Sequence, residues 1–300
     1  MAIGKEKYAI INCDDTGSFL GANLAAFELL ELGHVTSATI MTCCPWAPHA
    51  VKWAAAHPQY AIGLHLTTTS EWHGYKWGPV AESVPSLTDE NGYFYPDSST
   101  FEQKADMTET EKEVRAQLAQ IRRLGLEPSH WDNHMGTLYG VATGRFEMLE
   151  LFFRLSAETG LPLRFPMLGL AGQEQNRTLD IQAPGIAQAL AMAQAAAKRL
   201  GLIGPDYLMP HDFNGPQKES YEQFRDYLYT FIESFPHGIT ETYLHPNSDT
   251  GEARNASGAG FRRVWEYQLY KDPKTRQHYK DCGIELISYR DLRRLRGSLV

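Results

Sequence analysis

The chain contains few cysteines, and those it has are not arranged for cross-linking. Only four of its 300 residues are cysteine, Cys13, Cys43, Cys44 and Cys282, and no two of them form a CxxC pair. A disulfide framework and a cysteine-based zinc clip are therefore not expected. We interpret all four as reduced residues that pack inside a cytoplasmic protein.

Long apolar runs and an excess of basic residues are also missing. The alanine-rich stretch near residue 190 is interrupted by glutamine and lysine, and the first ten residues, MAIGKEKYAI, lack the apolar core of a secretory signal. Neither a membrane span nor a secretory leader is expected. The formal net charge of -8 argues against nucleic acid or an anionic membrane as a partner. A cytoplasmic location is the expectation that remains.

Two motifs, one built on glycine and one on histidine, are absent around the first strand. It has no GxGxxG fingerprint of dinucleotide-binding sheets and no HxH, with which amidohydrolase-type barrels begin. What the chain does have is a regular alternation of β-rich and helical patterns. Strands are predicted at 7–13, 36–42, 60–66, 128–132, 161–165, 206–209, 239–244 and 284–287. Helices are predicted at 20–33, 46–57, 107–125, 144–160, 184–201, 217–235, 259–271 and 274–282.

This alternation predicts the fold class. One strand and one helix every 30 to 40 residues implies parallel strands joined by crossover helices. We therefore predict an α/β fold, an irregular TIM-like (β/α) barrel with seven or eight units, with an open doubly wound sheet as the alternative. Neither an internal repeat nor a low-complexity linker interrupts the chain, so residues 1–300 are expected to form a single domain.

One segment, at about 67–106, does not follow the alternation. It contains Trp72, His73, Tyr75 and Trp77, and a hairpin-like stretch that turns at an Asn-Gly pair. Long insertions in compact barrels are usually lids or binding loops. Exposed tryptophans here would suit the apolar faces of sugar rings, so Trp72 and Trp77 are candidate substrate-binding residues. The alternative is that these rings form the core of the loop itself.

Ionisable residues stand where the predicted strands end, and this position is more informative than their type. They are Asp14 and Asp15, His65, then His130, Asp132 and His134, then Arg164, His211 with Asp212, and His245. The carboxyl ends of parallel barrel strands meet at one mouth, where barrel enzymes keep their active sites. Each residue alone has an ordinary interpretation, such as a helix cap, a salt bridge or a loop turn. Together they would be costly to bury unless they bind an ion or one another.

A mixed set of aspartates and histidines favours a divalent metal. Imidazole and carboxylate together bind Zn²⁺, Mn²⁺ or Fe²⁺, and two histidines with one carboxylate leave positions for water and substrate. In HWDNH, a strand period of two would put His130, Asp132 and His134 on one face. If the strand ends early, His134 turns away alone. The spacing does not separate these two cases.

The motifs resemble those of the YdjC-like/ChbG carbohydrate deacetylases, distant relatives of the NodB-type polysaccharide deacetylases. INCDDTG is similar to the family's N-x-D-D-F-G, AIGLHLTTT to its I-G-x-H-x-x-L-T, and PSHWDNH to its P-T-H-x-D-S-H. GHVTS, YLHPN and LISYRDL complete the series in order along nearly the whole chain. Thr16 departs from the usual Phe, Cys13 from a small residue, and Met135 and Gly136 from the histidines that often follow His134.

The resemblance implies an irregular barrel with one divalent metal, magnesium or zinc, that removes N-acetyl groups from amino sugars such as chitooligosaccharides. By motif, Asp15, His65 and His134 would be metal ligands, Asp14 the catalytic base and His245 the general acid. Arg164 would orient Asp14 or bind substrate, while Asp132 and His130 would support His134.

Other functions stay open at this stage. They are a barrel hydrolase acting on an ester or a phosphate, and a barrel that binds carbohydrate without turnover. His211 and Asp212 are candidate substrate-binding residues in the deacetylase interpretation. The expected partner is an N-acetylated sugar, and a homodimer is compatible with a sequence that does not fix the oligomeric state.

Overall fold

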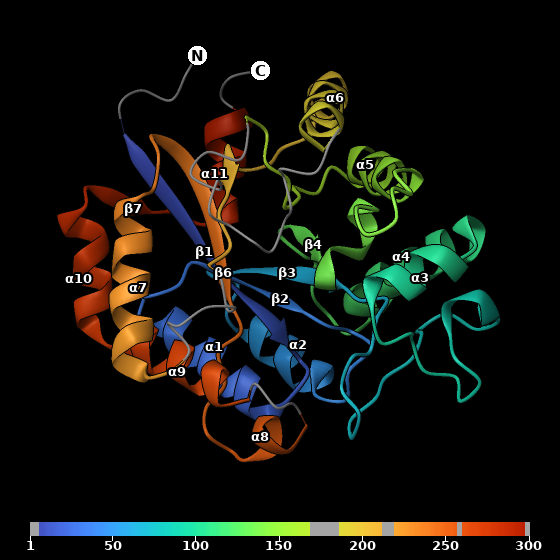
Figure 1. The fold of residues 1–300 in the computed structure, drawn as a ribbon, viewed down its shortest axis with the longest axis horizontal. Helices are drawn as coiled ribbons and strands as arrows, with labels where there is room; N and C mark the ends of the chain where they lie inside the picture. The colour runs from blue at the N-terminus through green and yellow to red at the C-terminus, as the bar shows by residue number, and fades with distance from the viewer. Residues whose placement is uncertain (1–5, 169–185, 212–218, 257–259, 298–300) are drawn as a thin grey trace.

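The fold is a curled sheet of parallel strands surrounded by helices (Figure 1). The computed structural model describes residues 6–168, 186–211, 219–256 and 260–297. Its seven described strands follow the order β4-β3-β2-β1-β6-β5, with β7 also paired to β1, and all pairings are parallel. The strands are β1 Lys7–Thr16, β2 Ser37–Ile40, β3 Ala61–Leu66, β4 Trp131–Asn133, β5 Tyr207–Leu208, β6 Gly238–Leu244 and β7 Ile284–Leu286. The predicted α/β fold with parallel strands is confirmed.

Strand β1 is the centre of the sheet. It pairs with β6 from Lys7 to Cys13, while on its other side β7 pairs with its first residues and β2 with its last. Ala9, Ile10 and Ile11 are completely buried, as expected for a strand covered on both faces. The end of β1 is therefore held on two sides, and this is where Asp14 and Asp15 lie.

The strand predicted at 161–165 does not form a regular strand of the sheet. Only an isolated bridge between Trp131 and Leu163 forms there. The backbone still continues the ring, since the Trp131 N–H donates to Pro162 O and the Leu163 N–H donates to Ile203 O. Because Pro162 has no N–H, the segment cannot complete a ladder of its own. At this point, isolated backbone hydrogen bonds rather than a ladder connect β4 to the residues that precede β5.

The helices form the outer layer (Figure 1). They are α1 Leu20–Glu31, α2 Ala47–Ala56, α3 Ser98–Lys104, α4 Met107–Arg123, α5 Glu147–Thr159, α6 Ile186–Arg199, α7 Tyr221–Glu233, α8 Glu252–Ala256, α9 Gly260–Lys271, α10 Pro273–Asp281 and α11 Tyr289–Gly297, with the short 3₁₀ turns η1 Pro85–Leu87 and η2 His134–Tyr139. Helix α4 begins where the Asp106 side chain accepts from two backbone N–H groups, and it ends in two arginines, as dipole and capping effects favour. No described helix combines the length and apolarity that crossing a membrane requires.

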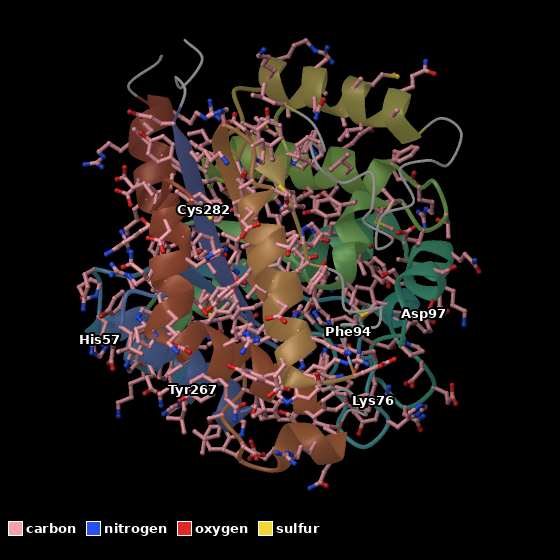
Figure 2. All side chains as sticks on the ribbon, turned by 60° about the vertical axis from the view of Figure 1, so that its left-hand side comes forward. His57, Lys76, Phe94, Asp97, Tyr267 and Cys282 are labelled. Atoms are coloured by element: carbon pink, nitrogen blue, oxygen red, sulfur yellow. The ribbon has the colours of Figure 1, made fainter. Side chains whose placement is uncertain are left out.

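The long segment between β3 and α4 is structured. It contains η1, α3 and a single antiparallel bridge between Thr88 and Phe94. Figure 2 shows Lys76, Phe94 and Asp97 of this segment on one side of the molecule. Phe94 and Phe101 are almost fully buried, so the segment carries apolar residues of its own into the core.

Helix α1 meets the loop that follows β6 backbone to backbone. The Ser248 N–H donates to Gly21 O over 2.9 Å. A Cβ at position 21 would lie 2.7 Å from Ser248 O, closer than real Cβ atoms approach other atoms. Glycine at this position therefore allows the contact. The loop after β6, which this contact holds against α1, also carries His245.

All four cysteines are unpaired. Cys13 and Cys44 are buried, while Cys43 and Cys282 are partly buried. Their expected role as packing residues agrees with these positions.

Candidate metal centre and active site

Polar side chains converge where β1, β3 and β4 end. Asp14 and Asp15 lie near the end of β1, and His65 lies near the end of β3. Strand β4 stops at Asn133, so His134 is the first residue of η2. The chain turns sharply after it, because Met135 has a φ of 53°. His134 thus leaves the strand, which resolves the alternative that the spacing of HWDNH left open.

Asp15, His65 and His134 present ligand atoms to a common point. Asp15 Oδ1 is 3.3 Å from His65 Nε2 and 3.2 Å from His134 Nδ1. The three ligand atoms all lie within 4.8 Å of one another. Neighbouring ligands at about 2.1 Å from a tetrahedral ion are about 3.4 Å apart, which is close to these separations.

Each of these histidines has a carboxylate on its other nitrogen. His65 Nδ1 is 2.6 Å from Asp132 Oδ1, and His134 Nε2 is 3.0 Å from Glu71 Oε2. A carboxylate in that position keeps the proton on its side of the ring and leaves the opposite nitrogen as a lone-pair donor. In its neutral form, each ring would therefore direct its remaining lone pair toward Asp15.

The same carboxylates set the proton affinities of the two rings. Burial lowers the pKa of His65, but Asp132 and Asp15 outweigh it and raise this pKa to about 9. Burial likewise opposes a charge on His134, yet Glu71 and Asp15 raise its pKa well above the ordinary value. The pocket thus favours positive charge at both rings.

Asp15 itself shows why a cation fits this point. Both of its carboxylate oxygens are buried and neither accepts a well-aligned hydrogen bond from the described residues, although Oδ2 forms an ion pair with Arg263 Nη1 over 2.8 Å. Burial raises its pKa, but Arg263, His134 and His245 together hold it well below 3.8, so Asp15 is ionised. Its backbone φ of 58° is unusual for a residue other than glycine and turns its side chain out of the strand direction. A buried carboxylate oxygen, Oδ1, that accepts no hydrogen bond and faces two imidazole nitrogens fits a divalent cation.

Asp14 has different partners from its neighbour. Arg164 donates two parallel hydrogen bonds of 2.7 Å, one to each carboxylate oxygen, and Asn12 Nδ2 donates a third to Oδ1. Although burial raises the pKa of Asp14, Arg164 lowers it to about 2. The two adjacent aspartates thus point to separate positive partners, which relieves their repulsion.

A second group, Asp14 with His65 and Asp132, also brings ligand atoms together. Both carboxylates of this group already contact Arg164, whose guanidinium lies 2.8 Å from Asp132 as well as beside Asp14. In the first group, Arg263 contacts Oδ2 of Asp15 and leaves Oδ1 facing the two imidazoles. The group around Asp15 is therefore the better candidate for an ion.

Arg164 is buried inside the barrel, where it forms ion pairs with side chains from several strands. Besides the two aspartates it contacts Glu241 Oε1 over 2.9 Å, and its guanidinium lies 4.3 Å from the centre of the Tyr243 ring. Burial is the main reason that the pKa of Glu241 rises to about 7, even though Arg164 and Tyr289 oppose this rise. The placement favours the expectation that Arg164 orients Asp14 over the expectation that it binds substrate.

The expectation that His130 and Asp132 support His134 is wrong. Asp132 holds His65, the other ring. His130 stacks on Tyr289 with the ring centres 3.8 Å apart, and its Nε2 lies 3.3 Å from Asn12 Oδ1. Because β4 ends before His134, the strand period that would have aligned the three side chains does not extend that far.

His245 and His211 share one buried carboxylate. The backbone N–H of His245 donates to Glu266 Oε2 over 2.9 Å, and His211 Nε2 lies 2.7 Å from Glu266 Oε1. Burial lowers the pKa of His245, while Asp15 acts in the opposite direction. The His211 side chain has no exposed surface, so its placement does not support the expected contact with substrate. Asp212 lies outside the described residues.

Trp72 and Trp77 are buried, so the expectation that their rings are exposed is wrong. Their exposed fractions are 7% and 3%. Trp72 stacks on Phe19 with the ring centres 4.9 Å apart, and the Trp77 indole N–H donates to Thr69 O. The apolar rings pack against the barrel because burial stabilises them more than exposure does. They form a wall beside the site, with Trp77 6.3 Å from the His134 ring.

Two residues of the site could not be anticipated. Arg263, on α9, lies 2.8 Å from Asp15 Oδ2, and Glu71 comes from the segment after β3. Neither stands at the end of a predicted strand, so the rule that predicted the positions of the other residues does not apply to them.

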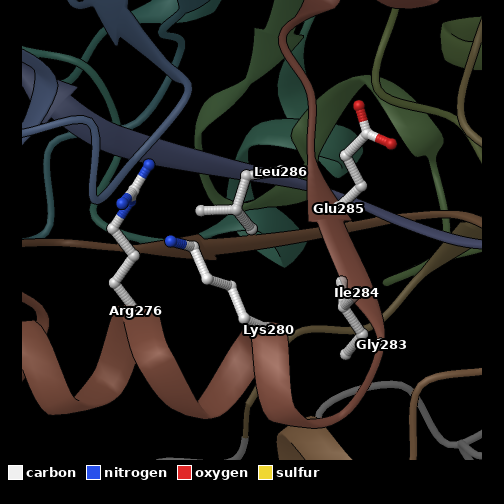
Figure 3. A pocket seen from close by; sticks show the side chains of 6 residues that line it. All are labelled: Arg276, Lys280, Gly283, Ile284, Glu285 and Leu286. Atoms are coloured by element: carbon white, nitrogen blue, oxygen red, sulfur yellow. The ribbon is translucent and has the colours of Figure 1, made fainter.

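A cavity of about 400 Å³ lies elsewhere in the fold (Figure 3). It is lined by Arg276 and Lys280 of α10 and by residues 283–286. Ile284 pairs with Lys7, at the start of β1, so this cavity is at the opposite end of the strand from Asp14 and Asp15. It shares no residue with the candidate site.

Relatives of this chain among known proteins share one name, carbohydrate deacetylase. A protein of Geobacillus stearothermophilus named carbohydrate deacetylase is 38% identical over 295 residues, which is 96% of this chain and 99% of the relative. A carbohydrate deacetylase of Brevibacillus brevis is 36% identical over 172 residues, 57% of this chain and 64% of that protein.

A solved structure has the same fold. It is from Enterococcus faecalis V583 and is described as a proposed cellobiose-phosphate cleavage protein. It superposes with a TM-score of 0.72 at 26% identity and covers 96% of this chain and 99% of its own. The sequence pattern of the YdjC-like proteins matches residues 8–281, and on this evidence the chain belongs to the YdjC-like protein family.

Proposed function

We propose that the chain is a metal-dependent deacetylase that hydrolyses the N-acetyl group of an amino sugar or a short N-acetylated oligosaccharide. The observation that carries this proposal is the meeting of Asp15 Oδ1 with the lone-pair nitrogens of His65 and His134. The relatives named carbohydrate deacetylase support the substrate class.

Asp15, His65 and His134 would hold the cation, and Asp132 and Glu71 would orient the two imidazoles. A divalent cation bound there supplies Lewis acidity, which polarises an acetyl carbonyl and lowers the pKa of a water molecule. Zinc suits the mixed nitrogen and oxygen donors, and magnesium is the alternative.

Asp14 would accept the proton of the attacking water. With a pKa of about 2 it is ionised at neutral pH, which is the form that a base requires. Among the described residues, only Arg164 donates a hydrogen bond to Oδ2, so an acceptor direction remains for a water. A carboxylate of such low pKa is a weak base, and it suffices because the water is acidified at this site.

His245 would protonate the departing nitrogen. It lies on the loop after β6, on the far side of β1 from β3. Because burial lowers the pKa of His245, it would act as an acid after taking up the proton that the attacking water releases, and the negative charge of Asp15 favours that protonated form. Glu266 fixes the backbone of His245 by accepting from its N–H. The site would thus hold the base and the acid on opposite sides of the acetyl group, as amide hydrolysis needs.

An acetate-release assay tests the proposal. The protein is stripped with a chelator, reloaded separately with Zn²⁺, Co²⁺, Mn²⁺ or Mg²⁺, and incubated with N-acetylglucosamine and chitooligosaccharides. We expect acetate and a free amine in equal amounts, only after metal is added. Acetyl esters and p-nitrophenyl phosphate serve as competing substrates. Faster release of acetate from the ester, or of p-nitrophenol from the phosphate, would favour a different hydrolase. Sugar binding without release of acetate would favour a carbohydrate-binding barrel without turnover.

A further inference from the structure

The two oxygens of Asp15 face different kinds of partner. Oδ1 faces the nitrogens of His65 and His134, at 3.3 and 3.2 Å. Oδ2 is 2.8 Å from Nη1 of Arg263. The arginine comes from α9, about 250 residues further along the chain, and no strand end brings it there. The carboxylate is therefore divided between the candidate metal position and a fixed positive charge.

Arg263 is held in place from several directions. Its guanidinium lies 5.1 Å from the centre of the Trp72 ring, a cation–π distance, and its side chain is only 14% exposed. Its backbone carbonyl accepts from the N–H of Asn247, in the loop after β6. Because the ring, the loop and the helix all restrain it, the guanidinium cannot easily leave Oδ2.

The number of oxygens that a carboxylate offers affects which cation it prefers. Calcium takes six to eight oxygen ligands and often both oxygens of one carboxylate. Zinc takes four ligands and binds well to two imidazoles and one carboxylate oxygen. A guanidinium on Oδ2 removes that oxygen from the ligand set, and its charge also disfavours any cation that needs a strongly anionic site.

We propose that Arg263 is a positioning residue that restricts Asp15 to coordination through Oδ1 and thereby selects a cation of low coordination number over calcium. This inference rests on the metal site of the proposed function. It assigns to Arg263 a role separate from that of Arg164, which holds the neighbouring Asp14.

The test compares cation selectivity in variants of the full chain. The decisive variant is Arg263→Gln, and Arg263→Met, which keeps the aliphatic stem against Trp72, is the second. The matched control is Arg262→Gln, because Arg262 is adjacent on α9 but lies over Phe261, at 5.3 Å. Dissociation constants for Zn²⁺ and Ca²⁺ are measured by competition with a chromophoric chelator. Absorption spectra of the Co²⁺-loaded proteins report the coordination number.

We expect the ratio of the Ca²⁺ to the Zn²⁺ dissociation constant to fall at least tenfold in Arg263→Gln and Arg263→Met, within the range known for residues that orient metal ligands. The Co²⁺ bands should weaken as coordination number rises, and Arg262→Gln should match wild type. A purely structural role would weaken both cations equally. An unchanged ratio, or an equal change in Arg262→Gln, would overturn the inference. If the wild type released acetate while the ratio stayed constant, only this inference would fail; if the wild type bound no divalent cation, the proposed function would fail too.

Discussion

Arg164 and Asp14 form a bidentate pair inside the barrel, with both N–H···O distances at 2.7 Å. The two residues are 150 positions apart in the sequence, and both side chains are almost fully buried. The fork geometry of the guanidinium fixes the plane of the Asp14 carboxylate. The activity and the stability of the protein should both depend on this pair.

Replacement of Asp14 by asparagine should separate metal binding from turnover. The amide cannot accept the proton of the attacking water, whereas Asp15, His65 and His134 are unchanged. We expect a loss in kcat of about 10²–10⁴, the range for a general base, with the metal content of the wild type. Acetate release and metal analysis on the same sample measure both. Near-full turnover in the metal-loaded variant would remove Asp14 from the role of base.

Arg164→Met should be strongly destabilising. It leaves Asp14, Asp132 and Glu241 buried without their cation, a situation that costs about 3–5 kcal/mol. The matched control is Arg115→Met, which breaks a surface pair with Glu158 and should change stability by about 0–1 kcal/mol. Urea unfolding monitored by circular dichroism compares the two variants. Equal effects would contradict the central position of Arg164.

The destabilisation in Arg164→Met should itself depend on pH. In the wild type the pKa of Asp14 is about 2, below its ordinary 3.8, so the pair contributes stability above about pH 4 and loses it as the pH falls through 2. The stability difference between wild type and variant should therefore shrink between pH 5 and pH 2. Urea unfolding at several pH values measures it, and a difference that grows in acid would have the wrong sign.

Metal binding should release protons and become tighter as the pH rises. The pKa of His65 is raised to about 9 by Asp132, so at neutral pH a cation must displace its proton. We expect the dissociation constant to fall as the pH rises from about 6 toward 9. Calorimetry in two buffers of different ionisation enthalpy counts the protons released. A pH-independent constant would show that His65 does not bind the cation.

His65→Ala tests directly whether His65 is a metal ligand. This substitution should lower the amount of bound metal and the activity in proportion. His73→Ala is its control, because His73 is exposed in the segment after β3 and has no part in the site. Metal content and acetate release are measured in parallel. Full metal content in His65→Ala would remove it from the ligand set.

Trp77→Ala should act on folding before it acts on substrate. The ring is 3% exposed and donates to Thr69, so its removal should cost about 3–5 kcal/mol, as for other buried aromatic residues. Tyr93→Ala, at a residue 41% exposed in the same segment, should have a much smaller effect. Thermal unfolding compares them. A stable Trp77→Ala protein with only a raised KM would restore the sugar-binding interpretation.

Much of the site was predictable because a simple rule governs it. In a sheet of parallel strands, residues at strand ends meet at one edge. This rule predicts that Asp14, Asp15 and His65 meet, and the family resemblance adds His134. The strand predicted at 161–165 is reduced to a single bridge, because Pro162 has no N–H to extend the ladder, and the apolar pattern of the segment does not show this.

The residues that the sequence did not reveal come from outside the strand ends. Glu71 is one acid in a forty-residue segment, and Arg263 is one of two adjacent arginines on α9. Only the packing of that segment and that helix onto the mouth identifies them. Burial of Trp72 was equally hidden, since a tryptophan in a loop has the same pattern whether it faces solvent or stacks on Phe19.

The backbone of Gly21 lies so close to the backbone of Ser248 that no residue with a side chain fits at position 21. Because the main chain of α1 touches the main chain around Ser248, even one added methyl group would push the two segments apart. One of them follows β1, the strand that carries Asp14 and Asp15, and the other carries His245. A backbone contact thus sets how closely α1 approaches this loop, and we expect Gly21→Ala to displace His245, the proposed proton donor, without touching any side chain of the candidate site.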